Sequence, residues 1–251
     1  MKITFLGSSC GVPQSDRYCS SAMIECGDRL YLLDAGAPVT ELMREKGRTP
    51  DELSAVFITH MHGDHLNGLS GLVDIMSWYY KNADPAIFLP ETEYIEVLEG
   101  WVSVFRCGGA VRPLRYASVR DGVIYSDGTV RVTAIRTKHM QKANRPSYAY
   151  MIESLVEGDE KRVLFTGDLS HSCEDYPSVA SEKEFDLIIC EAAHFDPLRR
   201  TEIFGKSRTK RFIVNHAGVR ISKGAMPELL TFCSLMPFEA HVTFDGEEVT
   251  I

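Results

Sequence analysis

The segment Val56–Gly68, VFITHMHGDHLNG, constrains this 251-residue chain most strongly. A strand-like apolar run leads into the pattern H-x-H-x-D-H, which uses three of the eight histidines and consists of His60, His62, Asp64 and His65. A hydrophobic core has no use for such a group, whereas imidazole and carboxylate are good ligands for zinc and similar divalent ions. The segment therefore predicts a metal site at the end of a buried strand.

Further candidate ligands follow strand-like runs elsewhere: AIRTKH ends at His139, VLFTGD at Asp168 and FIVNH at His216. Strand ends open onto one rim of a sheet, where residues far apart in the sequence converge and are held rigidly. We expect two metals, held by two sets of three residues that share one carboxylate: His60, His62 and His139; Asp64, His65 and His216; and Asp168. Two metals roughly 3.5–4 Å apart would lower the pKa of a shared water.

Strand patterns outnumber helical ones, and the helical patterns fall between groups of strands. Helices are expected at Pro38–Gly47, Leu66–Tyr80 and Glu91–Phe105. The tail His241–Ile251 predicts a hairpin, with Asp245 and Gly246 in the turn. No linker or repeat divides the chain, so we expect a single domain over 1–251, an α/β layered sandwich.

Composition narrows the function and the compartment. The net charge of −8, from 27 basic and 35 acidic residues, argues against wrapping a long nucleic acid but allows a small anionic substrate. No apolar run approaches the ~20 residues that span a bilayer, and the start does not resemble a signal peptide. The seven cysteines are odd in number and lack a C-x-x-C pair, which favours reduced thiols and a cytoplasmic protein.

Two surface segments have a functional and a structural interpretation. The basic residues Arg136, Lys138, Lys142 and Arg145 surround His139 and either hold a phosphate or form a solvated loop. MSWYY, Met76–Tyr80, either lines a pocket mouth or belongs to a helix core.

THMHGDH and the order of the other candidate residues resemble the metallo-β-lactamase superfamily of metal-dependent hydrolases. The resemblance covers essentially the full chain. It implies a four-layer αββα sandwich with a dinuclear site at one edge. It also implies that Asp34 supports the site from behind and is not itself a ligand.

Within that superfamily, FLGSSCGVPQSDRYCSSAMIE resembles the ribonuclease Z and phosphodiesterase branch. LIICEAAHF is similar to the branch's His-Glu-Ala-Thr motif, which implies that Glu191 works near the leaving group. The branch's His-Ser-Thr motif is missing between Glu191 and His216, so His194, the only imidazole in that interval, is the candidate general acid. The chain also lacks the long Gly/Pro-rich arm that grips tRNA.

The sequence thus predicts a dinuclear hydrolase that cleaves a phosphodiester, in a small nucleotide or RNA-like substrate, through a metal-bridging hydroxide. The expected catalytic residues are Asp64, Glu191 and His194. Zinc is the first choice of metal, with manganese or iron suited to the same ligands. RNA is allowed but not favoured, no membrane is expected, and a homodimer is allowed for. The alternatives are a lactone, ester or thioester hydrolase on the same fold, and a non-catalytic metal-binding accessory protein.

Overall fold

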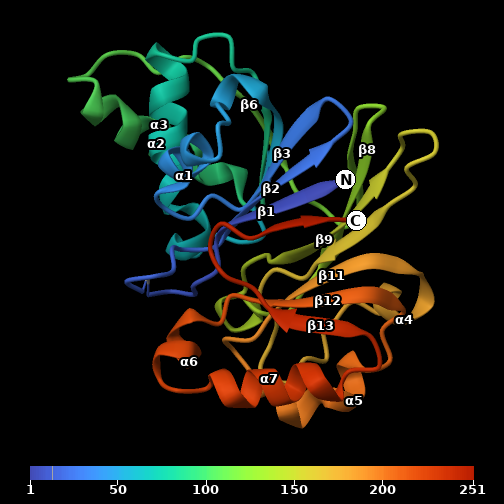
Figure 1. Ribbon diagram of the computed structural model, residues 1–251. Helices are drawn as coiled ribbons and strands as arrows, with labels where there is room; N and C mark the ends of the chain where they lie inside the picture. The colour runs from blue at the N-terminus through green and yellow to red at the C-terminus, as the bar shows by residue number, and fades with distance from the viewer. Residues whose placement is uncertain (13) are drawn as a thin grey trace.

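The computed structural model describes residues 1–12 and 14–251, so Pro13 of the opening loop lies outside the described residues. Two seven-stranded sheets pack face to face, and helices cover their outer faces (Figure 1). The first sheet has the order β14-β1-β2-β3-β4-β5-β6 and the second the order β13-β12-β11-β10-β9-β8-β7. The predicted αββα sandwich is confirmed.

The strands have the following bounds. The first sheet contains β1 (Lys2–Gly7), β2 (Ser21–Cys26), β3 (Arg29–Leu33), β4 (Leu53–Phe57), β5 (Ala86–Leu89), β6 (Arg115–Ser118) and β14 (Glu248–Thr250). The second contains β7 (Gly122–Ser126), β8 (Val130–Arg136), β9 (Tyr148–Ser154), β10 (Arg162–Phe165), β11 (Phe185–Glu191), β12 (Thr209–Asn215) and β13 (Glu239–Val242).

Helices divide into two groups, one for each sheet. Beside the first sheet lie α1 (Val39–Glu45), α2 (Gly63–Trp78) and α3 (Ile95–Phe105), with the 3-10 turns η1 (Pro50–Glu52) and η2 (Thr92–Tyr94). The second group comprises α4 (Val179–Glu182), α5 (Thr201–Phe204), α6 (Gly218–Ser222) and α7 (Met226–Leu235), with η3 (Gln141–Ala143) and η4 (Pro197–Arg200). No helix in the described ranges is both long and apolar enough to cross a membrane.

Each sheet pairs its strands antiparallel in one half and parallel in the other. Parallel neighbours need a crossover connection, which is why α1 and α2 fall between β3, β4 and β5. The ends of β4, β10 and β12 thereby lead into the segments that contain the candidate ligands.

Successive side chains of a strand point to opposite faces of its sheet, and the apolar ones form three separate clusters. Residues such as Phe57, Tyr150 and Ile213 fill the space between the two sheets. Leu32, Val56 and Leu72 belong to the cluster between the first sheet and its helices. A third cluster joins the second sheet to α5 and α7. The central strands of each sheet are therefore buried on both faces and read as nearly continuous apolar runs.

Two sequence predictions about local structure are wrong. The tail does not form a hairpin: β13 pairs with β12 in the second sheet, and β14 pairs with β1 in the first. Asp245 receives hydrogen bonds from the backbone and hydroxyl of Ser8 instead of shaping a two-strand turn. The second predicted helix begins at Gly63, not Leu66, so Asp64 and His65 belong to its first turn.

Candidate metal centre

The candidate ligands come from loops and helix starts that follow strands of both sheets. His60 and His62 follow β4, and α2 begins directly after them with Asp64 and His65. His139 follows β8, Asp168 follows β10 and His216 follows β12 at once. The strands end one to three residues before His60, His139, Asp168 and His216, so short loops complete the site.

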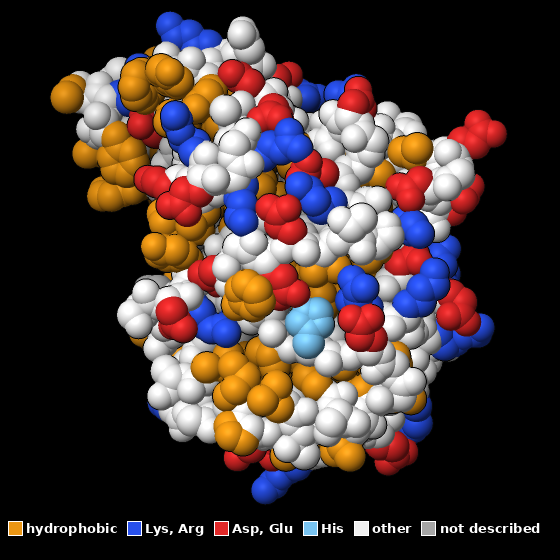
Figure 2. All heavy atoms as spheres, viewed as in Figure 1, with side chains coloured by type: hydrophobic (Ala, Val, Ile, Leu, Met, Phe, Trp, Pro, Cys, Tyr) orange, Lys and Arg blue, Asp and Glu red, His pale blue; other side chains and the backbone are white. Residues whose placement is uncertain are grey.

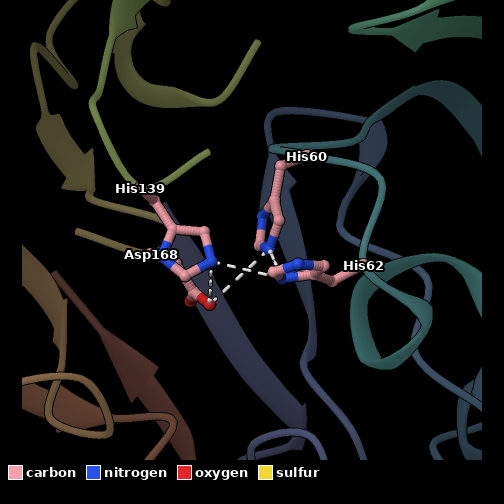
Figure 3. Close-up of side chains that lie close together, drawn as sticks. All are labelled: His60, His62, His139 and Asp168. Carbon is pink, nitrogen blue, oxygen red and sulfur yellow. Dashed lines mark hydrogen bonds and ion pairs between the residues drawn. The ribbon is translucent and has the colours of Figure 1, made fainter. Parts of the chain in front are cut away.

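A first cluster consists of His60, His62, His139 and Asp168. Figure 3 shows these side chains pointing toward one another, His60 and His62 from the segment after β4, and His139 and Asp168 from two other segments. His62 Nδ1 lies 3.0 Å from His60 Nε2 and 3.2 Å from His139 Nε2. Asp168 Oδ2 lies 3.6 Å from the Nε2 atoms of both His60 and His139. Three ring nitrogens and a carboxylate oxygen thus face a common point.

A second cluster consists of Asp64, His65 and His216. Asp64 Oδ2 lies 3.5 Å from the Nε2 atoms of both histidines. Asp168 borders this cluster as well, because its Oδ1 lies 3.4 Å from His216 Nε2 and its Oδ2 3.5 Å from His65 Nε2. One buried carboxylate therefore contacts members of both sets.

Several polar atoms at this site are buried without a hydrogen-bond partner among the described residues. They are His65 Nε2, Asp168 Oδ1, His216 Nδ1 and His216 Nε2. An unpaired polar atom in the interior costs free energy unless something else satisfies it. Lone pairs of imidazole and carboxylate that converge in this way fit divalent metals.

Hydrogen bonds behind the rings select which nitrogen faces the site. Asp34 Oδ2 accepts from His65 Nδ1 at 2.7 Å, and the Leu169 carbonyl oxygen lies 3.3 Å from His139 Nδ1. The rings of His65 and His139 then present Nε2, as supported metal-ligating histidines do. Asp34 is fully buried, and its other oxygen accepts from the backbone and hydroxyl of Thr59. It lies behind the clusters, as the family resemblance implies.

Electrostatics favour the protonation states that bind metals. Burial lowers the pKa values of His60, His62 and His139 and keeps these rings neutral. Burial opposes ionisation of Asp168, but the neighbouring His216, His65 and His60 hold its pKa well below the usual range.

His65 differs from the other rings. Burial acts to lower the pKa of His65, yet the charges of Asp168 and Asp34 outweigh it and raise that pKa well above its ordinary value. A cation at Nε2 would displace that proton, because metal binding releases protons from its ligands.

Glu191 and His194 form a connected pair beside the clusters. The Glu191 carboxylate accepts from the backbone amides of Leu169, Ala193 and His194, and His194 Nδ1 lies 3.0 Å from both of its oxygens. These bonds occupy the carboxylate, so Glu191 orients His194. Burial opposes the charged ring, but the hydrogen bond and charge of Glu191 raise the pKa of His194 to about 9. His194 Nδ1 lies 3.6 Å from Asp168 Oδ2.

The basic cluster around His139 is largely engaged elsewhere. Arg145 forms an ion pair with Glu91, Lys138 pairs with Glu174, and Arg136 lies over the Tyr148 ring.

His171, an isolated histidine in the sequence, contacts the His194 carbonyl oxygen. Only the folded structure reveals this contact, because the two residues lie in different loops.

A cavity of about 470 Å³ opens between α2 and α3 next to the ligand segments. Met61, between two candidate ligands, and Leu66, directly after His65, line it. Tyr94 and Trp101 form its opposite side. This volume falls within the range of small-molecule sites, ~300–1,000 Å³.

Comparisons with known proteins place the chain in a family. A family model described as Anti-Pycsar protein Apyc1 matches residues 1–197. A ribonuclease Z from Archaeoglobus fulgidus is 25% identical over 91% of this chain and 90% of its own length. A ribonuclease Z from Picosynechococcus sp. is 34% identical over 55% of this chain, and the match spans only 44% of that relative.

Solved structures share the fold across the whole chain. YhfI from Bacillus subtilis has a TM-score of 0.73 with 18% identity, covering 99% of both chains. The short form of human tRNase Z has a TM-score of 0.72 with 18% identity, covering 100% of this chain and 99% of its own. Zinc-bound PqqB from Methylobacterium extorquens has a TM-score of 0.68 with 16% identity, covering 100% of both chains.

Fold, clustered ligands and relatives together define a metal-dependent hydrolase of the metallo-β-lactamase fold, of the ribonuclease Z-like phosphodiesterase type. The resemblance inferred from the sequence is confirmed. More narrowly, the chain belongs to the family of the Anti-Pycsar protein Apyc1.

Proposed function

We propose that this protein is a dinuclear metal-dependent phosphodiesterase whose substrate is a small nucleotide-like diester. The observation that carries the proposal is the pair of ligand clusters that share Asp168. One cluster alone would suit a mononuclear site. Two clusters around one bridging carboxylate suit two ions that act on the same phosphate.

One ion would take His60, His62 and His139, and the second would take Asp64, His65 and His216, with Asp168 between them. When bound, two divalent metals stabilise the negative charge that develops on a transferring phosphoryl group and acidify water. Zinc is the first choice for this mixture of imidazole and carboxylate, and manganese or iron suits the same donors.

The chain's own residues would move the protons. Asp64, beside His65 and His216, orients the attacking water and takes its proton as oxygen bonds to phosphorus. His194 gives a proton to the leaving oxygen as the phosphorus–oxygen bond breaks. Glu191 fixes the position and tautomer of His194 through two 3.0 Å contacts.

A small substrate agrees with the charges around the site. The protein has a net charge of −8, and Arg145 and Lys138 near His139 are already paired with carboxylates. A protein binds a polyanion through free basic groups, which displace counterions from it. The ion pairs of Arg145 and Lys138 leave fewer basic groups free for this. The proposal therefore favours a small diester over a long RNA.

The test combines metal analysis with turnover. Purified protein is analysed for metal and assayed with bis(p-nitrophenyl) phosphate, p-nitrophenyl acetate and a thioester, before and after chelation and after adding zinc or manganese. We expect close to two metals per chain and phosphodiester hydrolysis that chelation abolishes and metal restores.

Other results would each redirect the proposal. Two metals with ester or thioester turnover alone would support the carboxylic-substrate hydrolase. Two metals without turnover of any substrate would support an accessory protein. A protein that takes up no metal after reconstitution would contradict the assignment of the ligands.

A further inference from the structure

The cavity between α2 and α3 borders the segments that contain the candidate ligands. Its floor includes Met61, which separates His60 from His62 in the sequence, and Leu66 and Asn67, which follow His65 on α2. A substituent of a phosphate held at the ligand clusters would therefore have this cavity beside it. We infer from this position that the cavity belongs to the substrate site.

The lining of the cavity is apolar and aromatic. Its far side is formed by Tyr94, Val97 and Trp101, which remain 44%, 66% and 57% exposed. Figure 2 shows apolar side chains gathered at the upper left, in the region where Figure 1 places α2 and α3. Large rings exposed at the wall of a cavity offer stacking surfaces for a planar ligand.

Charge in the cavity argues for a neutral group, not a second phosphate. Arg145 is the basic residue in the lining, and its guanidinium donates to both oxygens of Glu91, a largely buried carboxylate. The pair is close to neutral as a unit, and the Arg145 guanidinium lies 5.5 Å from the centre of the Tyr94 ring. Asn67 and Ser70 supply polar groups at the edge of the same cavity.

A flat, uncharged group with polar edges matches this lining better than an alkyl chain or an anion. We propose that the cavity between α2 and α3 binds the nucleobase of the substrate, with Trp101 and Tyr94 as stacking surfaces and Asn67 and Ser70 at its edge. This inference rests on the proposed phosphodiesterase function and assigns the base-binding part of the same site.

The kinetic test uses two substrates with the same leaving group. Thymidine 5′-(p-nitrophenyl phosphate) has a base, whereas methyl p-nitrophenyl phosphate has none. For Trp101→Ala, we expect KM for the thymidine substrate to rise on the order of tenfold with little change in kcat. The KM for the methyl substrate should not change, and Trp101→Phe should restore most of the affinity.

The chain offers a matched control, because it contains two tryptophans. Trp78 is also about half exposed, at the end of α2, but borders a different groove. Trp78→Ala should leave both substrates unaffected. An equal effect of Trp101→Ala on both substrates, or no effect on either, would overturn the base assignment while leaving the phosphodiesterase function standing.

A second measurement does not depend on turnover. In Trp78→Phe protein, Trp101 is the sole tryptophan, so its fluorescence reports on the cavity. Thymidine 5′-monophosphate should quench this signal in the metal-loaded protein, and ribose 5-phosphate should not. Quenching without hydrolysis of any phosphodiester would refute the proposed function and retain the base site, whereas equal responses to both ligands would refute the base site.

Discussion

At the scale of single residues, the site contains carboxylates that have the same chemistry but different structural roles. Asp34 supports His65 from behind, Asp168 touches both clusters, and Glu191 is occupied by backbone amides. Position along the sequence alone does not separate these roles. The hydrogen-bond partners of each carboxylate in the folded chain do.

Asp168→Asn tests the shared carboxylate. The amide keeps the shape of the side chain but removes the negative charge that faces both clusters, so we expect less than two metals per chain. Phosphodiester turnover should fall at least ~100-fold, since even mutating residues behind metal ligands costs ~10–100-fold. Metal analysis and bis(p-nitrophenyl) phosphate kinetics measure both effects.

Asp186→Asn is the matched control for that substitution. Asp186 lies near the start of β11, the strand that ends at Glu191, and pairs with Lys210 on the surface. Its loss should leave metal content and turnover near the original values. Retention of two metals and full activity by Asp168→Asn would show that Asp168 is not a bridging ligand.

His194→Ala tests the general acid through the leaving group. A nitrophenolate leaves without help, whereas an alkoxide needs a proton. We therefore expect a loss of ~10²–10⁴-fold in kcat for a diester with an alkyl leaving group. The loss should be much smaller for bis(p-nitrophenyl) phosphate. Equal losses for both leaving groups would instead indicate that His194 acts through the metal ligands it contacts.

At the scale of elements, α2 is the helix that sets the position of two candidate ligands. Its first turns pack directly on the segment after β3: Gly68 donates its backbone N–H to the Ala35 carbonyl, and Ala35 donates to the His65 carbonyl. A Cβ on Gly68 would lie 2.7 Å from the Ala35 oxygen. Asp64 and His65 are thus held by close backbone contact.

Two glycines on this one helix give opposite predictions. Gly68→Ala must push α2 away from Ala35, so we expect it to destabilise the protein by about 1–3 kcal/mol and to weaken metal binding. Gly71→Ala meets nothing within 4 Å and is exposed, so it should stabilise the protein by about 0.5–1 kcal/mol. Denaturant unfolding and chelator competition measure both. Equal changes in both variants would contradict the close packing.

The sequence predicted most strands and the first three helices, because apolar periodicity and caps are local signals. Thr49 and Glu52, for example, form a capping box at the start of η1. Prediction from the sequence failed for the tail. Whether β13 and β14 pair with each other or join different sheets depends on strands that are distant in the sequence. Two further features could not be predicted for the same reason, because they arise from contacts between segments far apart in the sequence. They are the backbone hydrogen bonds to the Glu191 carboxylate and the cavity beside Trp101.

At the scale of the whole molecule, both sheets share one core. Ile3 and Tyr31 of the first sheet belong to the same cluster as Val163 and Ile213 of the second. Neither sheet can expose its inner face without the other doing so. The expected single domain over 1–251 remains a prediction that follows from this shared core.

Calorimetry tests that prediction. We expect the metal-free protein to unfold in one cooperative transition. Metal at about 100 times its dissociation constant should add about 2.7 kcal/mol of stability and raise Tm by several degrees. Two separate transitions in the metal-free protein would contradict a single folding unit, and an unchanged Tm would contradict specific binding to the folded state.

The route of the tail has a consequence for synthesis on the ribosome. β14 supplies the neighbour of β1, the first strand of the chain, yet it emerges after every strand of the second sheet. Until then β1 has a neighbour only in β2, and its other edge is open to pairing with foreign chains. The first sheet therefore keeps this edge open until β14 has been translated, and nascent chains that stall before β14 should be the aggregation-prone species.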